Sequence, residues 1–451
     1  MIQLRSVHKA SPVPRVAAIF LWLLGLLCAA VAPLSAADNF PLYPCVSANV
    51  KFWEDVYSRY STHQGILHDT DDLSLVYGVV ELVDWEAPDA ASINSERIKT
   101  AKERIITVLT TLGSGNPAVT PEEKRIAALF PKQRHTSFHQ ARDNIRLQIG
   151  QKDRFYEGVL RSGKYLAHFK QIFLEKGLPA ELAYLPHVES SFNPKAFSKA
   201  GASGLWQFTR STGKQYLTIN QQLDERADPY LATFAAAQLL QENYAALQSW
   251  PLALTAYNYG RAGMVRALRE HGSYENIFDS YNQGYFKFAS RNFYSEFLAA
   301  MRVAKRFESL PRLPLEPPEA TATFRLKEDV PLARLLAAVK LSKAELLRLN
   351  PALLDPIAAG QQPVPKGYLV RTPAARQPLK SGAAAQHMQA APPVARNPVA
   401  ATRYTVRKGD TLSSIAQKFS CSPQAIQAAN GGKRLNVVQA GDQLAIPGRL
   451  R

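Results

Sequence analysis

The feature that most constrains the fold is an internal repeat near the C-terminal end of the chain. One short pattern occurs twice at an offset of 80 residues, beginning at Phe324 and at Tyr404. Each copy reads as a strand, two helices and a closing strand, so each needs a small core of its own and the chain must divide into several domains. Seven positions correspond: Phe324, Leu326, Leu332, Leu335, Leu336, Leu346 and Asn350 match Tyr404, Val406, Leu412, Ile415, Ala416, Ile426 and Asn430.

Two Pro-rich segments separate these units from the rest of the chain. Residues 309–322 carry four prolines and predict a short stiff connector. Residues 374–402 are rich in Ala and Pro and contain no acidic or aromatic residue, so they cannot bury a core and predict a linker. The repeats then occupy residues 323–373 and 403–448. After Asn350 the first copy has six extra residues before Gly367 corresponds to Gly441, which an insertion in a loop explains.

The chain between Phe52 and Arg306 shows helical periodicity almost throughout, which predicts a mainly α protein. Apolar residues from Ile98 to Leu112 follow one helix face and stop at Gly113. Thr120 and Glu123 form a capping-box pattern around Pro121. A further helix is expected over 157–176, with Gly177 closing it. Residues 38–160 are therefore expected to form a helical N-terminal region without recognisable chemistry.

The N-terminus has the pattern of a secretory signal peptide. Three basic residues precede an uncharged run over 16–32, and Ser35, Ala36 and Ala37 follow. We expect residues 1–37 to be cleaved, and a retained membrane anchor is the alternative. The net charge of +17 suits nucleic acid, anionic lipid or an acidic wall polymer, but export makes nucleic acid a remote partner. Cys45 and Cys421 remain after cleavage, and the sequence does not decide whether they pair.

Glu189 is the candidate for acid catalysis. A predicted helix beginning at Pro179 carries the apolar stripe Leu182, Leu185 and Pro186, and Glu189 continues that face. The simpler interpretation is a surface Glu at a helix end. Against it, Pro186 inside a helix would free the carbonyl of Leu182, a defect that helices tolerate near a bend or a site. A carboxyl against apolar walls has a raised pKa and can act as a general acid near neutral pH.

Two further motifs follow Glu189 in the chain. One is a Gly-rich loop that becomes aromatic, over 198–208, and the other is Ala256-Tyr257-Asn258-Tyr259-Gly260. Alone, each reads as ordinary packing, the first as a turn and the second as a helix C-terminus. Asp224, Glu225 and Asp228 are possible second carboxylates, but they cluster at a predicted helix start, where the helix dipole favours acids, and we assign them structural roles.

Taken in order, Glu189-Ser190, Asn193-Pro194, Gly204-Leu205-Trp206-Gln207, Ala256-Tyr257-Asn258 and Asn292-Phe293-Tyr294 resemble the soluble-lytic-transglycosylase family. The C-terminal copy resembles a LysM domain, and the whole arrangement is similar to the D type of membrane-bound lytic murein transglycosylases. The resemblance implies a lysozyme-like helical domain over 161–308, with no cofactor and no metal. The family often has Met at 206, a small residue at 259 and Glu-Thr at 290–291, so this chain departs there. The resemblance makes Glu189 the sole catalytic acid/base and places Ser198, Gln207, Tyr257, Asn258 and Tyr294 along the saccharide cleft.

The implied activity is cleavage of the bond between N-acetylmuramic acid and N-acetylglucosamine in peptidoglycan, with closure of a 1,6-anhydro ring. The alternatives are a hydrolytic muramidase and a non-catalytic wall-binding scaffold. The resemblance also implies binding of N-acetylglucosamine chains at Gly409, Asp410 and Thr411. Asp329, Val330 and Pro331 replace these residues in the first copy, which is expected to bind weakly or not at all. The expected location is the periplasm or cell envelope, with possible membrane association.

Overall fold

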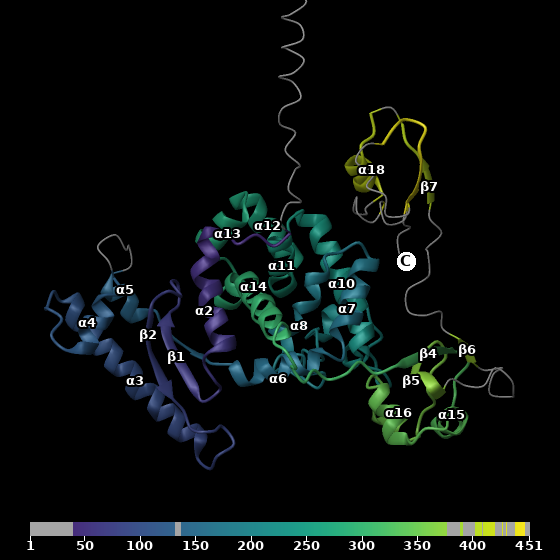
Figure 1. Cartoon of the computed structure of the whole chain (residues 1–451), viewed down its shortest axis with the longest axis horizontal. Coiled ribbons are helices and arrows are strands. Elements are labelled where there is room, and N and C mark those ends of the chain that lie inside the picture. The colour runs from purple at the N-terminus through teal and green to yellow at the C-terminus, as the bar shows by residue number, and fades with distance from the viewer. Residues whose placement is uncertain are drawn as a thin grey trace, which may run out of the picture. The chain divides into compact units, whose positions relative to one another are not determined.

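The computed structural model describes residues 39–130, 137–376, 388–390, 402–407, 409–419 and 438–446, together with Ile426 and Asn430. The chain divides into two units, Met1–Pro41 and Leu42–Arg451. The predicted signal peptide over 1–37 lies outside the described residues. No helix within the described part is long and apolar enough to cross a bilayer. Figure 1 labels the elements used below.

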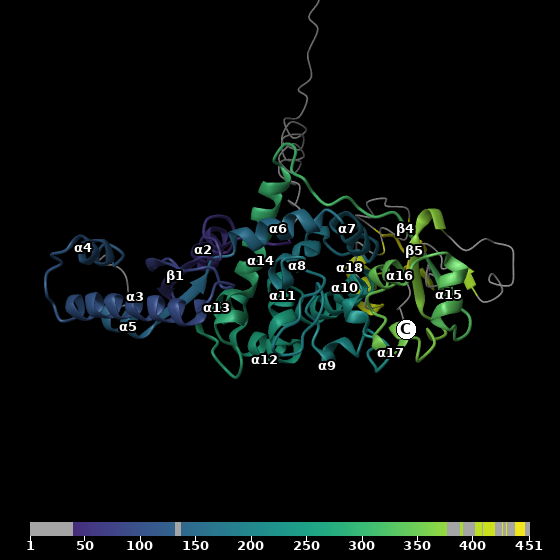
Figure 2. The same cartoon turned by 90° about the horizontal axis from the view of Figure 1, so that it is seen from below.

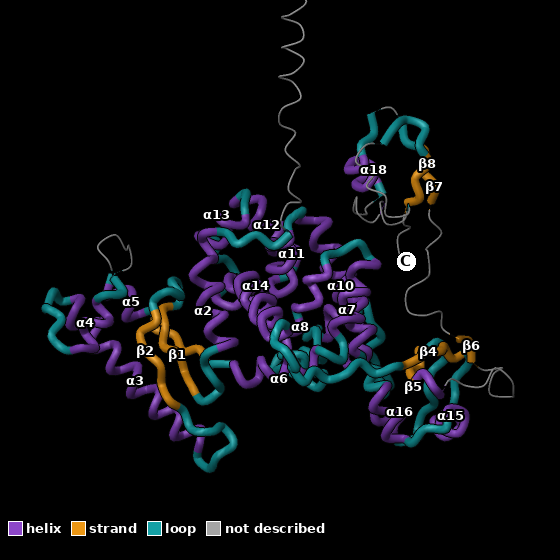
Figure 3. The backbone as a smooth tube through the Cα atoms, viewed as in Figure 1, coloured by secondary structure: helices purple, strands orange, loops and turns teal. Residues whose placement is uncertain are grey.

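The N-terminal region combines helices with a three-stranded antiparallel sheet (Figure 3). The strand order is β2-β1-β3, with Leu67 of β1 facing Leu147 of β3. A small core joins the sheet to α3, and the capping box predicted at Thr120 is present. The elements are η1 (Pro44–Val46), α2 (Ser47–Ser58), β1 (Gln64–Asp69), β2 (Val76–Glu81), α3 (Ala90–Gly113), α4 (Pro121–Ala127), α5 (Phe138–Asp143) and β3 (Ile145–Ile149).

The sheet corrects the prediction that residues 38–160 are helical. Five of the six residues of β1 are buried, so this strand lacks the alternation of buried and exposed residues that marks a strand in sequence. The helix expected to end at Gly113 is present as α3. The mainly α class of the whole chain is correct, with this sheet as an addition.

A helical body, here residues 152–308, follows. Its longest helix, α14, is buried along most of its length and packs against α2, α8 and α11. Helices α10, α11 and α12 lie together in both views (Figures 1 and 2). The elements are α6 (Lys152–Ser162), α7 (Leu166–Glu175), η2 (Ala180–Tyr184), α8 (Pro186–Ser190), α9 (Arg210–Gly213), η3 (Glu225–Ala227), α10 (Pro229–Leu247), α11 (Trp250–Tyr259), α12 (Arg261–His271), α13 (Tyr274–Ser280) and α14 (Phe288–Glu308).

Two predicted helices of the body are each divided. The helix expected over 157–176 breaks between α6 and α7, at Gly163. The connector crosses there: the Glu316 N–H donates to the Leu160 carbonyl at 2.9 Å, and a Cβ at Gly163 would lie 2.6 Å from the Glu316 oxygen. The helix expected from Pro179 is a 3₁₀ turn followed by α8, which begins at Pro186.

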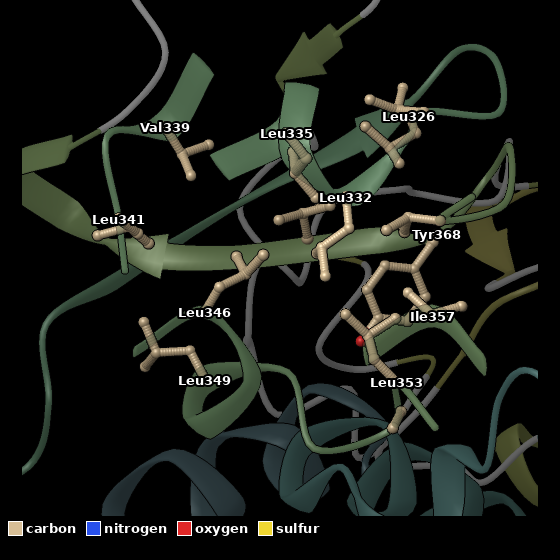
Figure 4. Close-up of a cluster of buried hydrophobic side chains, with 14 of the residues drawn as sticks. Leu326, Leu332, Leu335, Val339, Leu341, Leu346, Leu349, Leu353, Ile357 and Tyr368 are labelled. Carbon is tan, nitrogen blue, oxygen red and sulfur yellow. The ribbon is translucent and has the colours of Figure 1, made fainter. Parts of the chain in front are cut away.

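The two C-terminal repeats have corresponding structures. In the first, the predicted order of strand, two helices and strand is confirmed around one core (Figure 4). The inserted residues form a short extra helix, α17, and a three-residue strand, β6, falls within the predicted linker. The elements are β4 (Thr321–Leu326), α15 (Leu332–Val339), α16 (Lys343–Leu349), α17 (Asp355–Ala358), β5 (Leu369–Pro373), η4 (Ala374–Arg376) and β6 (Met388–Ala390).

The second repeat has β7 (Thr402–Thr405), α18 (Leu412–Lys418) and β8 (Gln443–Ile446). Its predicted second helix lies outside the described residues, apart from Ile426 and Asn430. Asn430 and Asn350 form equivalent hydrogen bonds. Each Nδ2 donates to the carbonyl four residues earlier and to a strand carbonyl, at Arg371 or at Ala445, and each Oδ1 accepts from the same strand residue. The sequence correspondence is therefore structural.

Candidate active site

Glu189 lies near the C-terminal end of α8, and the chain turns sharply after it. Ser191 and Phe192 both have left-handed backbone conformations, with φ of +48° and +52°, which stop the helix at once. The Ser190 hydroxyl donates to the Leu205 carbonyl at 2.8 Å and so connects α8 to the Gly-rich loop. Two motifs that are separated in sequence therefore meet beside Glu189.

The bend does not arise as the sequence suggested. Pro186 is the first residue of α8, and the Leu182 carbonyl accepts a hydrogen bond from the Leu185 N–H at 3.1 Å instead of standing free. Proline is well tolerated at the first position of a helix, because the N–H of that residue has no intrahelical partner. The change from 3₁₀ to α geometry therefore needs no broken bond.

Glu189 has the electrostatics of a general acid. Burial and, to a smaller extent, the charge of Glu296 together raise the pKa of its carboxyl to about 8. The side chain nevertheless retains part of its accessible surface. A carboxyl with this pKa holds its proton at neutral pH and can deliver it to a bound molecule.

Glu296 is a second carboxylate at the site, and sequence reasoning did not identify it. It lies on α14, and burial raises its pKa to about 8, while the charge of Arg146 on β3 opposes that shift. The charges of both carboxylates, after burial, raise the pKa of Tyr57 on α2. The available signal was an acidic residue on an otherwise apolar face, between Phe293 and Ala300. That signal does not reveal that α14 packs against α8.

The Gly-rich loop is held by backbone contacts that its glycines permit. Gly204 has φ of +76°, and a Cβ there would lie 2.1 Å from the Arg226 carbonyl oxygen. Gln207 donates from Nε2 to the carbonyls of Gly204 at 2.8 Å and Ala196 at 3.2 Å. Ser198 accepts the Ala202 N–H on its hydroxyl at 2.9 Å. Ser198 and Gln207 are therefore partly exposed side chains on one braced loop.

The end of α11 contacts this loop. The Tyr257 hydroxyl donates to the Trp206 carbonyl at 2.8 Å, and the charge of Glu189 contributes, after burial, to its raised pKa. The neighbouring Asn258 is exposed, and its side-chain oxygen accepts from the Ser290 hydroxyl at 2.7 Å. Trp206 itself is fully buried and donates to Thr233, so it belongs to the core.

Tyr294 is not brought to the site. Its side chain is fully buried and packs against Tyr274, with ring centroids 5.3 Å apart. The preceding Phe293 instead lies nearly parallel to the Tyr257 ring, at a centroid distance of 6.5 Å. A side chain without exposed surface cannot line a cleft. The position next to Tyr257 is therefore occupied by Phe293.

Asp224, Glu225 and Asp228 have the structural roles expected of them. Asp224 forms an ion pair with Arg226 at 2.7 Å. Asp228 caps α10 by accepting the N–H groups of Tyr230 and Leu231 at 2.9 Å. The Glu225 carboxylate accepts the Thr218 N–H at 2.7 Å.

The predicted glycan-binding turn of the second repeat is exposed. Gly409 has φ of +92°, and Thr411 accepts the Ser414 N–H near the start of α18. Asp410 accepts from the Tyr404 hydroxyl and from the Arg407 N–H, and the Arg407 hydrogen bond is the larger cause of its lowered pKa. Gly409 and Thr411 remain available to a ligand, whereas Asp410 shapes the turn.

Comparison with known families matches residues 173–279 to the transglycosylase SLT domain and residues 404–447 to the LysM domain. The chain carries both domains. The first match contains Glu189, the Gly-rich loop and Tyr257, and the second contains the exposed turn. The resemblance inferred from the motifs is thus confirmed.

Similar proteins were found among curated sequences. Membrane-bound lytic murein transglycosylase D of Escherichia coli (strain K12) is 29% identical over 300 residues, which cover 64% of this chain and 65% of that protein. A putative tributyltin chloride resistance protein of Alteromonas sp. (strain M-1) is 34% identical over 110 residues, covering 24% and 53% of the two chains.

Among solved structures, lytic transglycosylase Slt of Pseudomonas aeruginosa matches with a TM-score of 0.28 and 15% identity, over 50% of this chain and 35% of that one.

Proposed function

We propose that this protein is a peptidoglycan lytic transglycosylase. The observation that carries the proposal is Glu189, a carboxyl with a pKa of about 8 inside the SLT domain, beside a braced loop and Tyr257. Glu189 is the catalytic acid/base. Ser198, Gln207, Tyr257 and Asn258 bind the saccharide. The domain limits predicted from sequence, 38–160, 161–308, 323–373 and 403–448, are part of this proposal.

The reaction begins with proton transfer from Glu189 to the glycosidic oxygen between N-acetylmuramic acid and N-acetylglucosamine. The bond from C1 to that oxygen breaks, which leaves an oxocarbenium-like muramic residue and a free hydroxyl on the departing sugar. Glu189 is now ionised and accepts the proton of the muramic C6 hydroxyl. That oxygen attacks C1 and closes the 1,6-anhydro ring, so no water is consumed.

Glu296 makes a hydrolytic muramidase the second candidate, because most glycosidases use two carboxyl groups and the second can activate water. The raised pKa of Glu296 weighs against that role. With a pKa of about 8 it is mainly protonated at neutral pH, and a protonated carboxyl is a poor base. The structure therefore favours the route that relies on Glu189 alone.

Product mass separates the two candidates. Digestion of purified sacculi by the mature protein, followed by mass spectrometry, should give anhydro-muropeptides one water lighter than the products of a hydrolytic lysozyme. Incubation in H₂¹⁸O should leave the main products unlabelled. Labelled reducing-end muramic acid as the main product would establish hydrolysis, and absence of cleavage would overturn the enzymatic proposal.

We further propose that the protein acts in the cell envelope after export. The signal-like N-terminus supports this location, and so does the related protein of E. coli, which is named as membrane-bound. Peptidoglycan strands are then the substrate, and the second repeat binds their N-acetylglucosamine residues. Fractionation of cells that express the tagged full-length chain tests the location.

A further inference from the structure

The first repeat packs directly on the helical body. Leu353 of the repeat and Leu223 of the body form an antiparallel bridge. Backbone hydrogen bonds flank it: the Asp224 N–H donates to the Ala352 carbonyl at 2.9 Å, and the Leu354 N–H donates to the Gln222 carbonyl at 3.0 Å. Leu223 belongs to the core of the repeat, and Figure 4 shows Leu353 at the border of that core.

Charged side chains extend this contact. The Arg371 guanidinium lies 3.8 Å from the centre of the Tyr230 ring and 3.9 Å from an Asp228 carboxylate oxygen. Arg348 of the repeat pairs with Glu319 at 2.6 Å, and Lys164 of the body reaches the same carboxylate at 3.6 Å. Because the Arg371 side chain is only 11% exposed, its contact is more shielded from water than an ordinary surface pair.

The segment held by the repeat also holds the Gly-rich loop. Three residues after the bridge residue Leu223, Arg226 pairs with Asp224, and its side chain is 4% exposed. Its Nη1 donates to the Gly201 carbonyl at 2.7 Å, within the loop, and to the Phe208 carbonyl at 3.0 Å, at the end of the loop. A continuous set of hydrogen bonds therefore runs from Ala352 of the repeat to the loop that carries Gln207.

The corresponding turn of the first repeat differs from that of the second copy at its middle residue. Val330 is buried, and its backbone pairs with Val364 in both directions, at 2.9 and 2.8 Å. Asp329 is exposed, and its carboxylate accepts the Lys366 N–H at 2.7 Å. The middle position of the turn, which corresponds to Asp410, is thus used for internal packing, while Asp329 and Pro331 stand exposed in place of Gly409 and Thr411.

We propose that residues 323–373 are a positioning element of the catalytic domain. By holding residues 222–224 they fix Arg226. Through Arg226 they fix residues 201–208 of the Gly-rich loop, here called the saccharide loop. In this arrangement the second repeat is the one that binds glycan. The part of this inference that concerns catalysis rests on the proposed transglycosylase function, whereas the ordering of the loop does not.

The first test breaks the contact in the full chain. Leu223→Asp places a charge in the core of the repeat, and Leu174→Asp is the matched control at a leucine that is 55% exposed. Hydrogen exchange should speed up over residues 201–208 only in Leu223→Asp. The kcat/KM for cleavage of soluble glycan fragments should fall roughly tenfold or more, mainly through a higher KM, because a loop that is no longer fixed holds its saccharide-binding groups out of position. Leu223→Met should restore both properties.

The second test fixes the contact. Leu223→Cys with Leu353→Cys, in a chain with Cys45→Ser and Cys421→Ser, places two thiols at bridged positions, where a disulfide fits the strand spacing. The oxidised protein should cleave soluble glycan as fast as its reduced form and unfold at a higher temperature. A large loss of activity on oxidation would show that the repeat works only when released from the body, and would overturn the proposal.

The two tests distinguish failure of the positioning role from failure of the proposed transglycosylase function. Unchanged exchange over 201–208 in Leu223→Asp would overturn the positioning role whatever the activity. If the unmodified chain cleaves no glycan but the exchange result holds, the proposed function fails and the coupling of repeat to loop stands. Equal loss in Leu223→Asp and Leu174→Asp would also reject the proposal, because the effect would then not depend on the contact.

Discussion

Glu189 on α8 and Glu296 on α14 are electrostatically coupled: burial first, and then the charge of Glu296, hold the pKa of Glu189 at about 8. One of these residues lies in the sequence motif and the other lies outside it. The pKa of the proposed acid therefore depends on both carboxyl groups as well as on burial, although Glu189 alone carries out the proposed proton transfers.

Glu189→Gln should lower cleavage of sacculi by at least ~10²-fold, the usual range for loss of a general acid. The amide has nearly the same shape but cannot deliver the proton. Retention on sacculi and the unfolding temperature should stay near those of the unmodified chain. The control is Glu270→Gln, an exposed position on α12, which should keep full activity. Near-normal cleavage by Glu189→Gln would remove this residue from the mechanism.

The pH dependence of kcat/KM reports the pKa of the acid. Since Glu189 must be protonated, activity should decline on the alkaline side with a midpoint of about pH 8. Glu296→Gln removes a carboxyl that becomes negative in the same pH range, so ionised Glu189 becomes less unfavourable and the midpoint should move to lower pH. Glu270→Gln should leave the midpoint in place. An unchanged midpoint in Glu296→Gln would show that the two carboxyls are not coupled.

The same two groups make stability depend on pH. The pKa values of Glu189 and Glu296 are raised from 4.5 to about 8, so the folded protein binds more protons than the unfolded chain between those values. The free energy of unfolding should therefore fall as pH rises through this window. Glu296→Gln should make that fall shallower in chemical denaturation followed from pH 5 to 8, whereas Glu270→Gln should follow the unmodified chain.

Features that depend only on interactions between neighbouring residues were predicted correctly from the sequence. The capping box at Thr120 and the order of elements in the first repeat need only neighbouring residues, and both are present. Even the six-residue insertion is placed correctly, because Gly367 and Gly441 both have positive φ and donate to equivalent strand carbonyls, those of Leu326 and Val406.

The features that were missed depend on contacts between distant segments. Strand β1 is buried on both faces and so resembles no alternating pattern. The predicted helix breaks at Gly163, where the backbone of Glu316 crosses it, and the role of Glu296 depends on the packing of α14 against α8. Tyr294 and Phe293 are adjacent on one helix, so the motif alone does not tell which of the two rings faces Tyr257. In the structure it is Phe293.

Thr411→Val should weaken retention of the full chain on sacculi and its binding of chitin oligomers. The substitution keeps the shape of the side chain but removes the hydroxyl from the exposed turn and from the Ser414 N–H. Loss of such a cap costs about 1 kcal/mol, so the repeat should stay folded. Thr411→Ser should bind normally, and so should Thr405→Val, an exposed change on β7. Equal binding by all three variants would argue that the turn does not contact glycan.

Gly204 and Gly201 provide a matched pair in the saccharide loop. Their φ values are +76° and +77°, so an alanine at either position carries the same backbone strain of ~1 kcal/mol or more. A Cβ at Gly201 meets no atom within 4 Å, whereas a Cβ at Gly204 would lie 2.1 Å from the Arg226 carbonyl oxygen. That clash involves backbone on both sides, which cannot rotate away as a side chain does.

Gly204→Ala should therefore destabilise the protein by roughly 1–3 kcal/mol more than Gly201→Ala, the usual cost of overpacking. Displacing Arg226 also loosens both ends of the loop, because its guanidinium binds the Gly201 and Phe208 carbonyls. Chemical denaturation measures the first effect and cleavage of soluble glycan fragments the second. The difference between the two variants isolates the contact with Arg226 from the strain that both share, and equal values for the two would show that segment 222–228 does not brace the loop.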